Sequence, residues 1–464
     1  MINFSYQKQQ SKANAEKIRM EEASKALDYY NNRQIDYLLD RIAYLYPTEK
    51  DAMAKYAYCY PLTRSLIEDI AICFQESAEI LPESETEAVL ERWQEVIEKS
   101  HLQASLLLTD RMVELLGKVG VCVRWHSSGY VVLDLLTPDR TVVEQDPEDH
   151  SKAKSVRYLI SEKSNTIDGE ICTWAYWDAD SYQEQIINST GGVREITKNE
   201  PNPYGKIPVA WFTNTLELDE FWHDLGYPIV DTNEAVNLRL SNLMLALDYQ
   251  TVSLLVTVGM PASQSIPVGV TQRLNIPADG LGGSLQGYDA KYITPSPLLR
   301  DVWDLINQLI TNVARLYGLS AQSYNRDSSS FASGYQLKLS KQDIVNRNKM
   351  KRELYREPVK ELAGLIAECY SINNSDNFTF GDVSFSVDFG DVKFEDNPME
   401  REQLNAMRLS NGTTSEVQIL MDENPDLSRE DAEKLYEKYR EDRNRLGTAS
   451  ASRLANALGV NEQL

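Results

Sequence analysis

The second half of the chain contains two stretches in which apolar residues recur at three- and four-residue steps. They run from about Ile229 to Tyr249 and from Val302 to Leu316, and Gly318 follows the second. This spacing places the apolar side chains on one face of a helix, and glycine commonly follows a helix end. The sequence therefore predicts two amphipathic helices, the first with Asn233 and Asn237 on its polar side. The apolar positions are Val230, Val236, Leu240, Leu243, Met244 and Leu247 in the first helix and Val302, Leu305, Ile306, Leu309, Ile310, Val313 and Leu316 in the second.

The residues between and after these helices have a different character. From Leu254 to Pro297, short β-like runs alternate with glycines and prolines. This pattern predicts a small β-structured insert. Residues 320–334 are rich in serine and carry little apolar surface, so they predict a mobile loop.

Period-two patterns predict a sheet in the first half of the chain. Residues 119–125, 130–136, 155–160 and 173–177 read as its strands. Residues 383–389 alternate apolar and polar side chains, which predicts a half-buried strand that could return to this sheet.

Other segments predict helices. Residues 13–37 have a thin apolar stripe, typical of a helix that lies across a neighbour and here a candidate arm between subunits. Helices are also predicted at 61–75 and, as one helix, at 84–116. The helix after residue 335 is the most basic region, and Pro358 should kink or interrupt it. Residues 427–445 predict a helix with a solvated, charged surface.

Composition describes a folded protein with a strong negative charge. The 464 residues are 42% hydrophobic and 25% charged, and the net charge is −23. This length favours more than one structural region. The acidity argues against a protein that grips nucleic acid over its whole surface, although a wall that repels phosphate suits a conduit through which DNA slides. Acidity for solubility alone is the equally weighted alternative.

The sequence predicts neither secretion nor a membrane span. The N-terminus lacks an apolar signal core, and no run of 18 apolar residues is present. Five widely spaced cysteines predict buried small side chains rather than disulfides or a zinc site.

Catalytic motifs are absent from the sequence. The four histidines are scattered, so we expect no metal site and no cofactor. Residues 279–284 are glycine-rich but lack the Gly-Lys-Ser/Thr ending of a phosphate-binding loop, so a turn is the better interpretation. We therefore expect a protein that is not an enzyme.

Four short motifs, in order, resemble the bacteriophage portal protein (head-to-tail connector) family of the SPP1 type. The resemblance covers roughly residues 120–445, and the first 120 residues match only in general helical character. The motifs are Asn202–Pro208 before the first long helix, Gly318–Ser320 after the second, Ser333–Lys338 at the start of the basic helix, and Asn411–Glu416 followed by Asn424–Ser428.

This resemblance implies an α/β (mixed, helix-rich) portal-type subunit that forms rings. The implied regions are an N-terminal arm and wing (1–225), a first stem helix (226–253), a clip (254–297), a second stem helix (298–319), a tunnel loop (320–334), a long wing helix with a returning strand (335–398) and a crown (399–464).

The resemblance also implies a function. The protein would form a dodecameric ring at one capsid vertex, through which the genome is packaged and ejected. Implied partners are further copies of the chain, the terminase large subunit, a head-tail adaptor, capsid and scaffolding proteins, and double-stranded DNA without sequence specificity. No membrane is involved. The implied location is the virion, with the host cytoplasm during assembly.

Candidate site residues fall into three groups. Hydroxyls and one guanidinium in the tunnel loop could touch phosphates without reading bases. Basic residues of the following helix could contact DNA or the acidic face of a neighbouring subunit. Clip residues could bind partners. In order, the groups are Ser323, Asn325, Arg326, Ser328, Ser329, Ser330 and Ser333; Lys338, Lys341, Arg347 and Lys349; and Arg273, Asp279 and Lys291.

Two other classes of protein stay open at this point. One is a structural capsid or neck protein whose opening is too narrow for a duplex. The other is a two-carboxylate tail glycosidase, which would be a monomer with a carbohydrate-sized cleft.

Overall fold

The structure is a computed structural model of the chain. It describes residues 2–84, 86–165, 169–187, 193–215, 221–222, 226–251, 254–258, 272–276, 289–293, 299–319, 342–390, 405–424 and 427–441. Helices and sheets both contribute to the fold, which confirms the mixed class. The chain forms two compact units, one comprising Met1–Ser328 with Ser340–Val392 and the other Ser329–Leu339 with Lys393–Leu464.

The second unit is small and helical in its described part. Residues 405–410 and 429–441 are helical, and α13 spans Glu416–Glu423 between them. Ser415 caps α13, because its Oγ accepts a hydrogen bond of 3.1 Å from the backbone N–H of Gln418. The helix at 429–441 agrees with the charged helix predicted over 427–445.

The first unit begins with six helices. These are α1 (Ile2–Tyr30), α2 (Ile35–Leu45), α3 (Lys50–Ala54), α4 (Leu62–Ile70), α5 (Glu87–Ser100) and α6 (Leu102–Leu116). The prediction of one helix over 84–116 is wrong, because His101 takes a left-handed conformation (φ 52°) that separates α5 from α6. Part of α1 packs inside its own chain, where Ala23, Ala26 and Tyr29 are fully buried.

Two antiparallel sheets follow the helices. One has the order β3-β2-β9 (Tyr130–Leu136, Lys118–His126, Val209–Thr213), and the other is a meander of β4 (Thr141–Gln145), β5 (Ala153–Asn165), β6 (Gly169–Trp177), β7 (Ser181–Ile187) and β8 (Val193–Pro201). All four predicted strands are present, but they belong to two sheets rather than one. Cys122, Val156 and Trp177 are among the side chains buried between these strands.

The predicted return of residues 383–389 to this sheet is wrong. Strand β13 (Phe385–Asp388) pairs instead with β1 (Glu79–Pro82) in a separate two-stranded sheet. The alternation itself predicts the strand correctly, because Phe385 and Val387 are buried while their neighbours are exposed. Alternation identifies a strand but not its partner.

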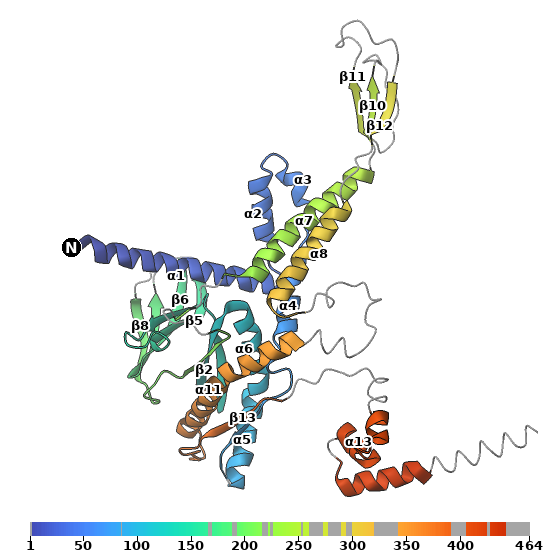
Figure 1. The fold of residues 1–464 in the computed structure, drawn as a ribbon. Helices are drawn as coiled ribbons and strands as arrows, with labels where there is room; N and C mark the ends of the chain where they lie inside the picture. The colour runs from blue at the N-terminus through green and yellow to red at the C-terminus, as the bar shows by residue number, and fades with distance from the viewer. Residues whose placement is uncertain are drawn as a thin grey trace, which may run out of the picture. The chain divides into compact units, whose positions relative to one another are not determined.

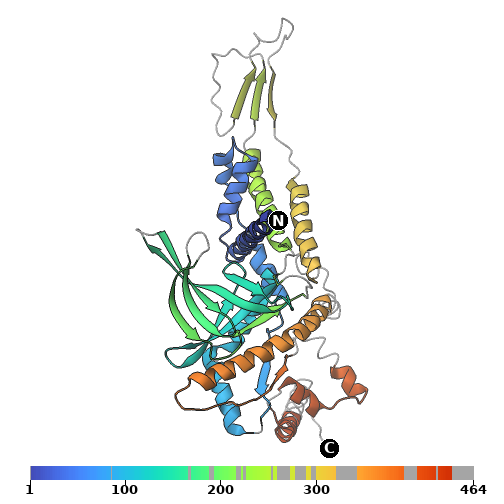
Figure 2. The ribbon, with the colours of Figure 1, turned by 90° about the vertical axis from the view of Figure 1, so that its left-hand side faces the viewer.

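The two predicted amphipathic helices are α7 (Pro228–Thr251) and α8 (Leu299–Leu316). They lie side by side, with α2 and α3 on the opposite flank of α7 (Figures 1 and 2). Between them along the chain is a three-stranded sheet of order β11-β10-β12 (Gln272–Ile276, Leu254–Val258, Asp289–Ile293). The predicted β insert is therefore confirmed at the level of its strands.

The helix α11 (Gln342–Asn373) is the longest in the described part of the chain and contains Pro358. Of the two predicted effects of Pro358, a kink or an interruption, the interruption is wrong, because the helix continues through this proline. Tyr355, Val359, Leu362 and Ile366 are buried on both sides of it. This packing offsets the hydrogen bond that proline removes.

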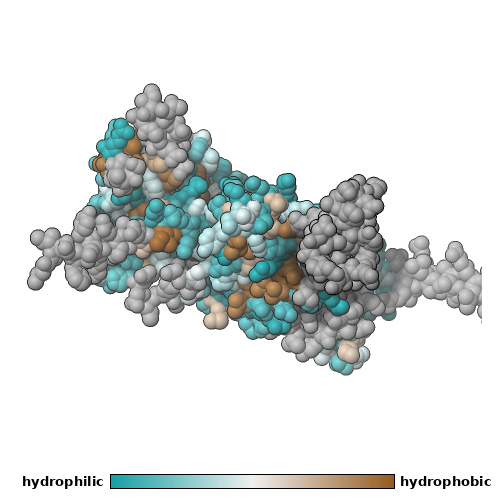
Figure 3. All heavy atoms as spheres, turned by 90° about the horizontal axis from the view of Figure 1, so that it is seen from above, coloured by the Kyte–Doolittle hydropathy of each residue, from teal (hydrophilic) through white to brown (hydrophobic). Residues whose placement is uncertain are grey.

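On the face seen from above in Figure 3, the described surface is mostly hydrophilic with separate apolar patches. Among the described residues no helix has the length and apolarity to cross a membrane. Cys73, Cys122 and Cys369 are buried as predicted, whereas Cys59 and Cys172 are partly exposed.

Candidate functional site

The candidate site consists of α7, α8 and the N-terminal half of α11, the helices that flank the predicted tunnel loop. The asparagines that the sequence places on the polar side of α7 do not face solvent. Asn233, Asn237 and Ser241 are fully buried. They stand at four-residue steps and accept hydrogen bonds of 2.8–3.0 Å from the backbone N–H groups of Thr63, Tyr60 and Tyr58, respectively. They hold residues 58–60 and the first turn of α4 against α7.

The C-terminal end of α8 meets the N-terminal end of α11. Gly318 has φ +80°, and a Cβ added there would lie 3.4 Å from the backbone of Asp343 and Ile344. The backbone N–H of Leu319 donates to the carbonyl of Ala314 at 3.0 Å, which closes the helix end. The two ends of the chain that flank residues 320–341 are therefore in contact.

A buried charge cluster joins α11 to α6. Lys351 Nζ lies 2.7 Å from Asp110 Oδ1 and 2.6 Å from Glu114 Oε1, and Arg347 Nη2 lies 2.8 Å from Glu114 Oε2. The two carboxylate side chains are fully buried, and that of Lys351 is 4% exposed. Tyr355 donates its hydroxyl hydrogen to Asp110 at 3.1 Å. Two acids and two bases thus balance each other, three of them buried and Arg347 partly exposed.

Burial and charge shift the pKa values of this cluster. Burial raises the pKa of Asp110 above its usual range, and the neighbouring Lys351 limits the rise. For Lys351, burial lowers the pKa, but the carboxylates of Asp110 and Glu114 outweigh it and raise the pKa overall. Lys351 is therefore held in its charged form.

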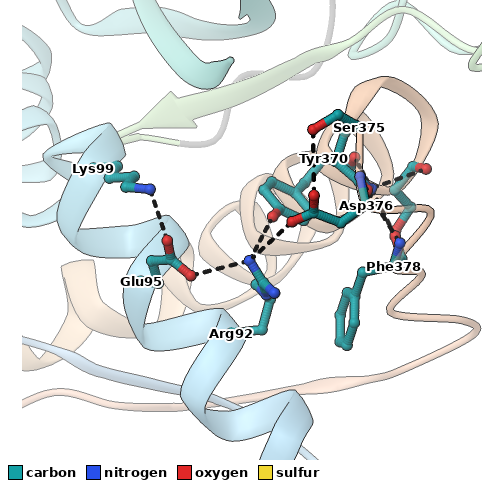
Figure 4. Close-up of polar contacts among 9 residues, drawn as sticks. Arg92, Glu95, Lys99, Tyr370, Ser375, Asp376 and Phe378 are labelled. Atoms are coloured by element: carbon teal, nitrogen blue, oxygen red, sulfur yellow. Dashed lines mark hydrogen bonds and ion pairs between the residues drawn. The ribbon is translucent and has the colours of Figure 1, made fainter.

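The other end of α11 is fastened to α5 (Figure 4). Arg92 Nη1 donates to the hydroxyl of Tyr370 at 3.1 Å and lies 3.6 Å from Asp376 Oδ2. Its guanidinium also lies 5.5 Å from the ring centre of Phe378. In the turn after α11, Asn374 Oδ1 accepts a hydrogen bond of 3.0 Å from the backbone N–H of Phe378. The helix is thus tied to α6 near one end and to α5 at the other.

Parts of α7 and α8 expose apolar side chains. Among the residues whose burial the structure describes, Met244 and Leu247 of α7 are 38% and 40% exposed, and Trp303, Leu305 and Leu316 of α8 are 50%, 43% and 73% exposed. The apolar side chains of α8 are therefore not all covered within the single chain.

The candidate site residues have different outcomes. Arg347 is paired with Glu114 of the same chain, and Lys349 is exposed. For Arg273 and Lys291 the structure describes only the backbone, in β11 and β12. The remaining candidates, Ser323, Asn325, Arg326, Ser328, Ser329, Ser330, Ser333, Lys338, Lys341 and Asp279, lie outside the described residues.

Sequence reasoning missed the acidic half of the charge cluster. Asp110 and Glu114 stand four residues apart, on the same face of α6 as the buried Leu106 and Val113. Their partners Arg347 and Lys351 show the same spacing on α11. Two acids inside an apolar helical stripe are the signal that could have indicated buried pairing.

In the described ranges, no group of three His, Cys, Asp or Glu side chains is placed to hold a metal ion. Comparison with curated proteins found none that matches the chain.

The solved structures similar to the chain include two from gene transfer agent (GTA) particles. The chain in the virion of a native GTA particle has 12% sequence identity and a TM-score of 0.38, with 80% of this chain and 92% of that chain covered. The chain in the neck of an empty GTA particle has 13% identity and a TM-score of 0.39, with 81% and 93% covered. These scores are too low to support an argument about function.

The sequence itself matches a family model. The model describes the phage portal protein, SPP1 Gp6-like, and matches residues 111–445. The matched range runs from within α6 through both sheets, α7, α8 and α11 to the second unit, and so spans well over half of the chain. The chain belongs to the SPP1 Gp6-like family of phage portal proteins.

Proposed function

We propose that this chain is the subunit of a dodecameric ring at one capsid vertex, which serves as the channel for packaging and ejecting the genome. The family match over residues 111–445 carries this proposal. The match includes residues 320–334, in which the tunnel loop would face DNA. The net charge of −23 fits a wall along which DNA slides without being trapped.

The apolar side chains of α7 and α8 support the ring. Side-by-side copies would bury Trp303 and Leu305, which one copy leaves in solvent. A repeated head-to-tail contact closes into a ring when its rotation allows closure. The ring would present Ser323, Arg326 and the other tunnel-loop candidates to DNA.

The β10–β12 region is the proposed docking site for the terminase large subunit and, later, the head-tail adaptor. Arg273, Asp279 and Lys291 are the candidate contacts. Lys349 stays a candidate for contact with DNA or a neighbouring subunit because it is exposed. Arg347 is a weaker candidate for this role, since Glu114 already binds its guanidinium.

Electron microscopy of the purified full chain tests the proposal. We expect rings with a central channel wide enough for a DNA duplex. A monodisperse monomer at working concentration would contradict the proposal, and rings with a narrower opening would favour a structural capsid or neck protein. No described feature favours the glycosidase.

A further inference from the structure

Arg347 lies where three helices meet. Its Nη2 is 2.8 Å from Glu114 near the end of α6, and its Cζ lies 4.9 Å from the ring centre of Tyr317, just after the end of α8. Its own backbone belongs to the second turn of α11. One side chain therefore contacts the ends of two helices from the start of a third.

The two basic residues of the cluster differ in their surroundings. The side chain of Lys351 is 4% exposed, and both carboxylates surround its ammonium group. The side chain of Arg347 is 32% exposed and borders a cavity of about 140 Å³ that Glu114 and Tyr317 also line. Lys351 neutralises the core of the cluster, whereas Arg347 extends it to α8.

The planar guanidinium suits this place. It can bond to a carboxylate through its edge while its face lies over an aromatic ring, which an ammonium group cannot do with the same geometry. Gly318, the residue after Tyr317, lies so close to the start of α11 that an added Cβ would be 3.4 Å from the backbone of Asp343 and Ile344. The side-chain contact and the backbone contact therefore hold the same junction.

We propose that Arg347 is a positioning residue that ties the end of α8 to α6 and so holds together the two helix ends between which residues 320–341 run. The functional meaning of this role rests on the proposed function, in which the tunnel loop within residues 320–341 faces the channel. Arg347 then acts through Glu114 and Tyr317 rather than by touching DNA. The basic residue that the sequence suggests as a DNA or intersubunit contact thus receives a role inside its own subunit.

Hydrogen exchange followed by mass spectrometry tests this role on the purified full chain. We expect Arg347→Met to accelerate exchange of the amides of residues 311–319 about tenfold, the order of magnitude of a lost, partly exposed cation–π contact together with its ion pair. Lys360→Met removes the same charge from a position of α11 with similar side-chain exposure, where the lysine pairs with Glu357 of the same helix, and should leave these amides unchanged. Unchanged exchange at 311–319 in folded Arg347→Met overturns the proposal.

Two further variants separate positioning from charge balance. Arg347→Lys keeps a cation beside Glu114. Its melting temperature should therefore be close to that of the wild type, whereas exchange at 311–319 should be as fast as in Arg347→Met. Tyr317→Leu removes the ring but keeps the ion pair, so it should accelerate the same amides even if Arg347→Met does not fold. Uniform acceleration across α6 and α11 in these variants would show a core role only and overturn the proposal.

The measurement does not require ring formation. If the chain stays monomeric, the proposed function fails while exchange at 311–319 can still be compared among the variants. If rings form and exchange at 311–319 does not respond, the role of Arg347 fails and the proposed function stands.

Discussion

Asn233 of α7 accepts hydrogen bonds from both the backbone N–H and the hydroxyl of Thr63, at 3.0 and 2.9 Å. Both residues are fully buried, and Asn233 also donates to the carbonyl of Tyr60 at 2.9 Å. The side chain thereby satisfies a backbone N–H in the first turn of α4 and the carbonyl of Tyr60, which precedes that helix. It ties α7 to the start of α4 and to the chain just before it.

Replacing Asn233 by leucine should destabilise the protein. The Thr63 N–H would be left buried without an acceptor, which costs about 1–3 kcal/mol. We expect the free energy of unfolding, measured by urea denaturation, to fall by about that amount or more. Arg239→Ala, at an exposed position of the same helix, should change it by less than about 0.5 kcal/mol. Equal losses in both variants would show that Asn233 has no special role.

Lys351→Met should lower the free energy of unfolding more than Asn233→Leu does, and the size of this loss should depend on pH. Removing one partner of a buried ion pair typically costs about 3–5 kcal/mol. Without Lys351, the pKa of Asp110 should rise further above its unfolded value. A raised carboxyl pKa contributes stability below the unfolded pKa, and this contribution is lost as pH rises through the folded pKa.

The deficit of Lys351→Met relative to the wild type should therefore grow from about pH 4 towards neutrality. Denaturation curves at several pH values measure it. A deficit that is constant over this range would mean that the carboxylates adapt without Lys351, for example through water or through Arg347.

The buried cysteines should be alkylated more slowly than the partly exposed ones. Burial raises the pKa of both Cys73 and Cys122 to about 12 and that of Cys369 to about 11. Their thiolates are scarce and covered at mildly alkaline pH. In the native protein, iodoacetamide should therefore modify the partly exposed Cys59 and Cys172 first. Peptide mapping after a short labelling pulse checks this, and early labelling of Cys122 would contradict the packing between the sheets.

Patterns in the sequence predicted helices and strands well where one face of the element is apolar and the other polar. The stripe of α8 and the alternation at Phe385 and Val387 are such cases. Partners were harder to predict, because β13 pairs with β1, some 300 residues earlier in the chain. Asn233 was misjudged because a polar side chain on a helix is usually solvated, whereas here a distant backbone segment needs its hydrogen bonds.

The candidate site was predictable only in outline. A basic helix can be read from composition, but the sequence does not show that Arg347 and Lys351 face Asp110 and Glu114 rather than solvent. That pairing depends on how α6 and α11 cross. His101 is a similar case, because its left-handed backbone ends α5 without the usual glycine.

Trp303 should matter for assembly more than for folding. Its side chain is 50% exposed in the single chain, so Trp303→Glu removes little packing within it. We expect unchanged monomer stability but a reduced ring fraction by size-exclusion chromatography with light scattering. Ile372→Glu, with a comparable exposure of 45% at the far end of α11, is the matched control and should leave the ring fraction unchanged. Equal ring fractions in the Trp303→Glu variant and the wild type would place the subunit contact elsewhere.

Salt should promote ring formation. Twelve copies at −23 each would carry a charge of about −276, and their mutual repulsion opposes assembly. Salt shortens the range of this repulsion to about 8 Å at physiological ionic strength, whereas burial of apolar side chains such as Trp303 does not depend on such screening. Mass photometry at about 50 and about 500 mM NaCl should therefore show a larger ring fraction at the higher salt. If ion pairs between basic residues such as Lys349 and a neighbour's acidic face dominated the contact, added salt would instead dissolve the rings. A ring fraction that falls with salt would thus show that ion pairs across the subunit contact outweigh the repulsion between the acidic subunits.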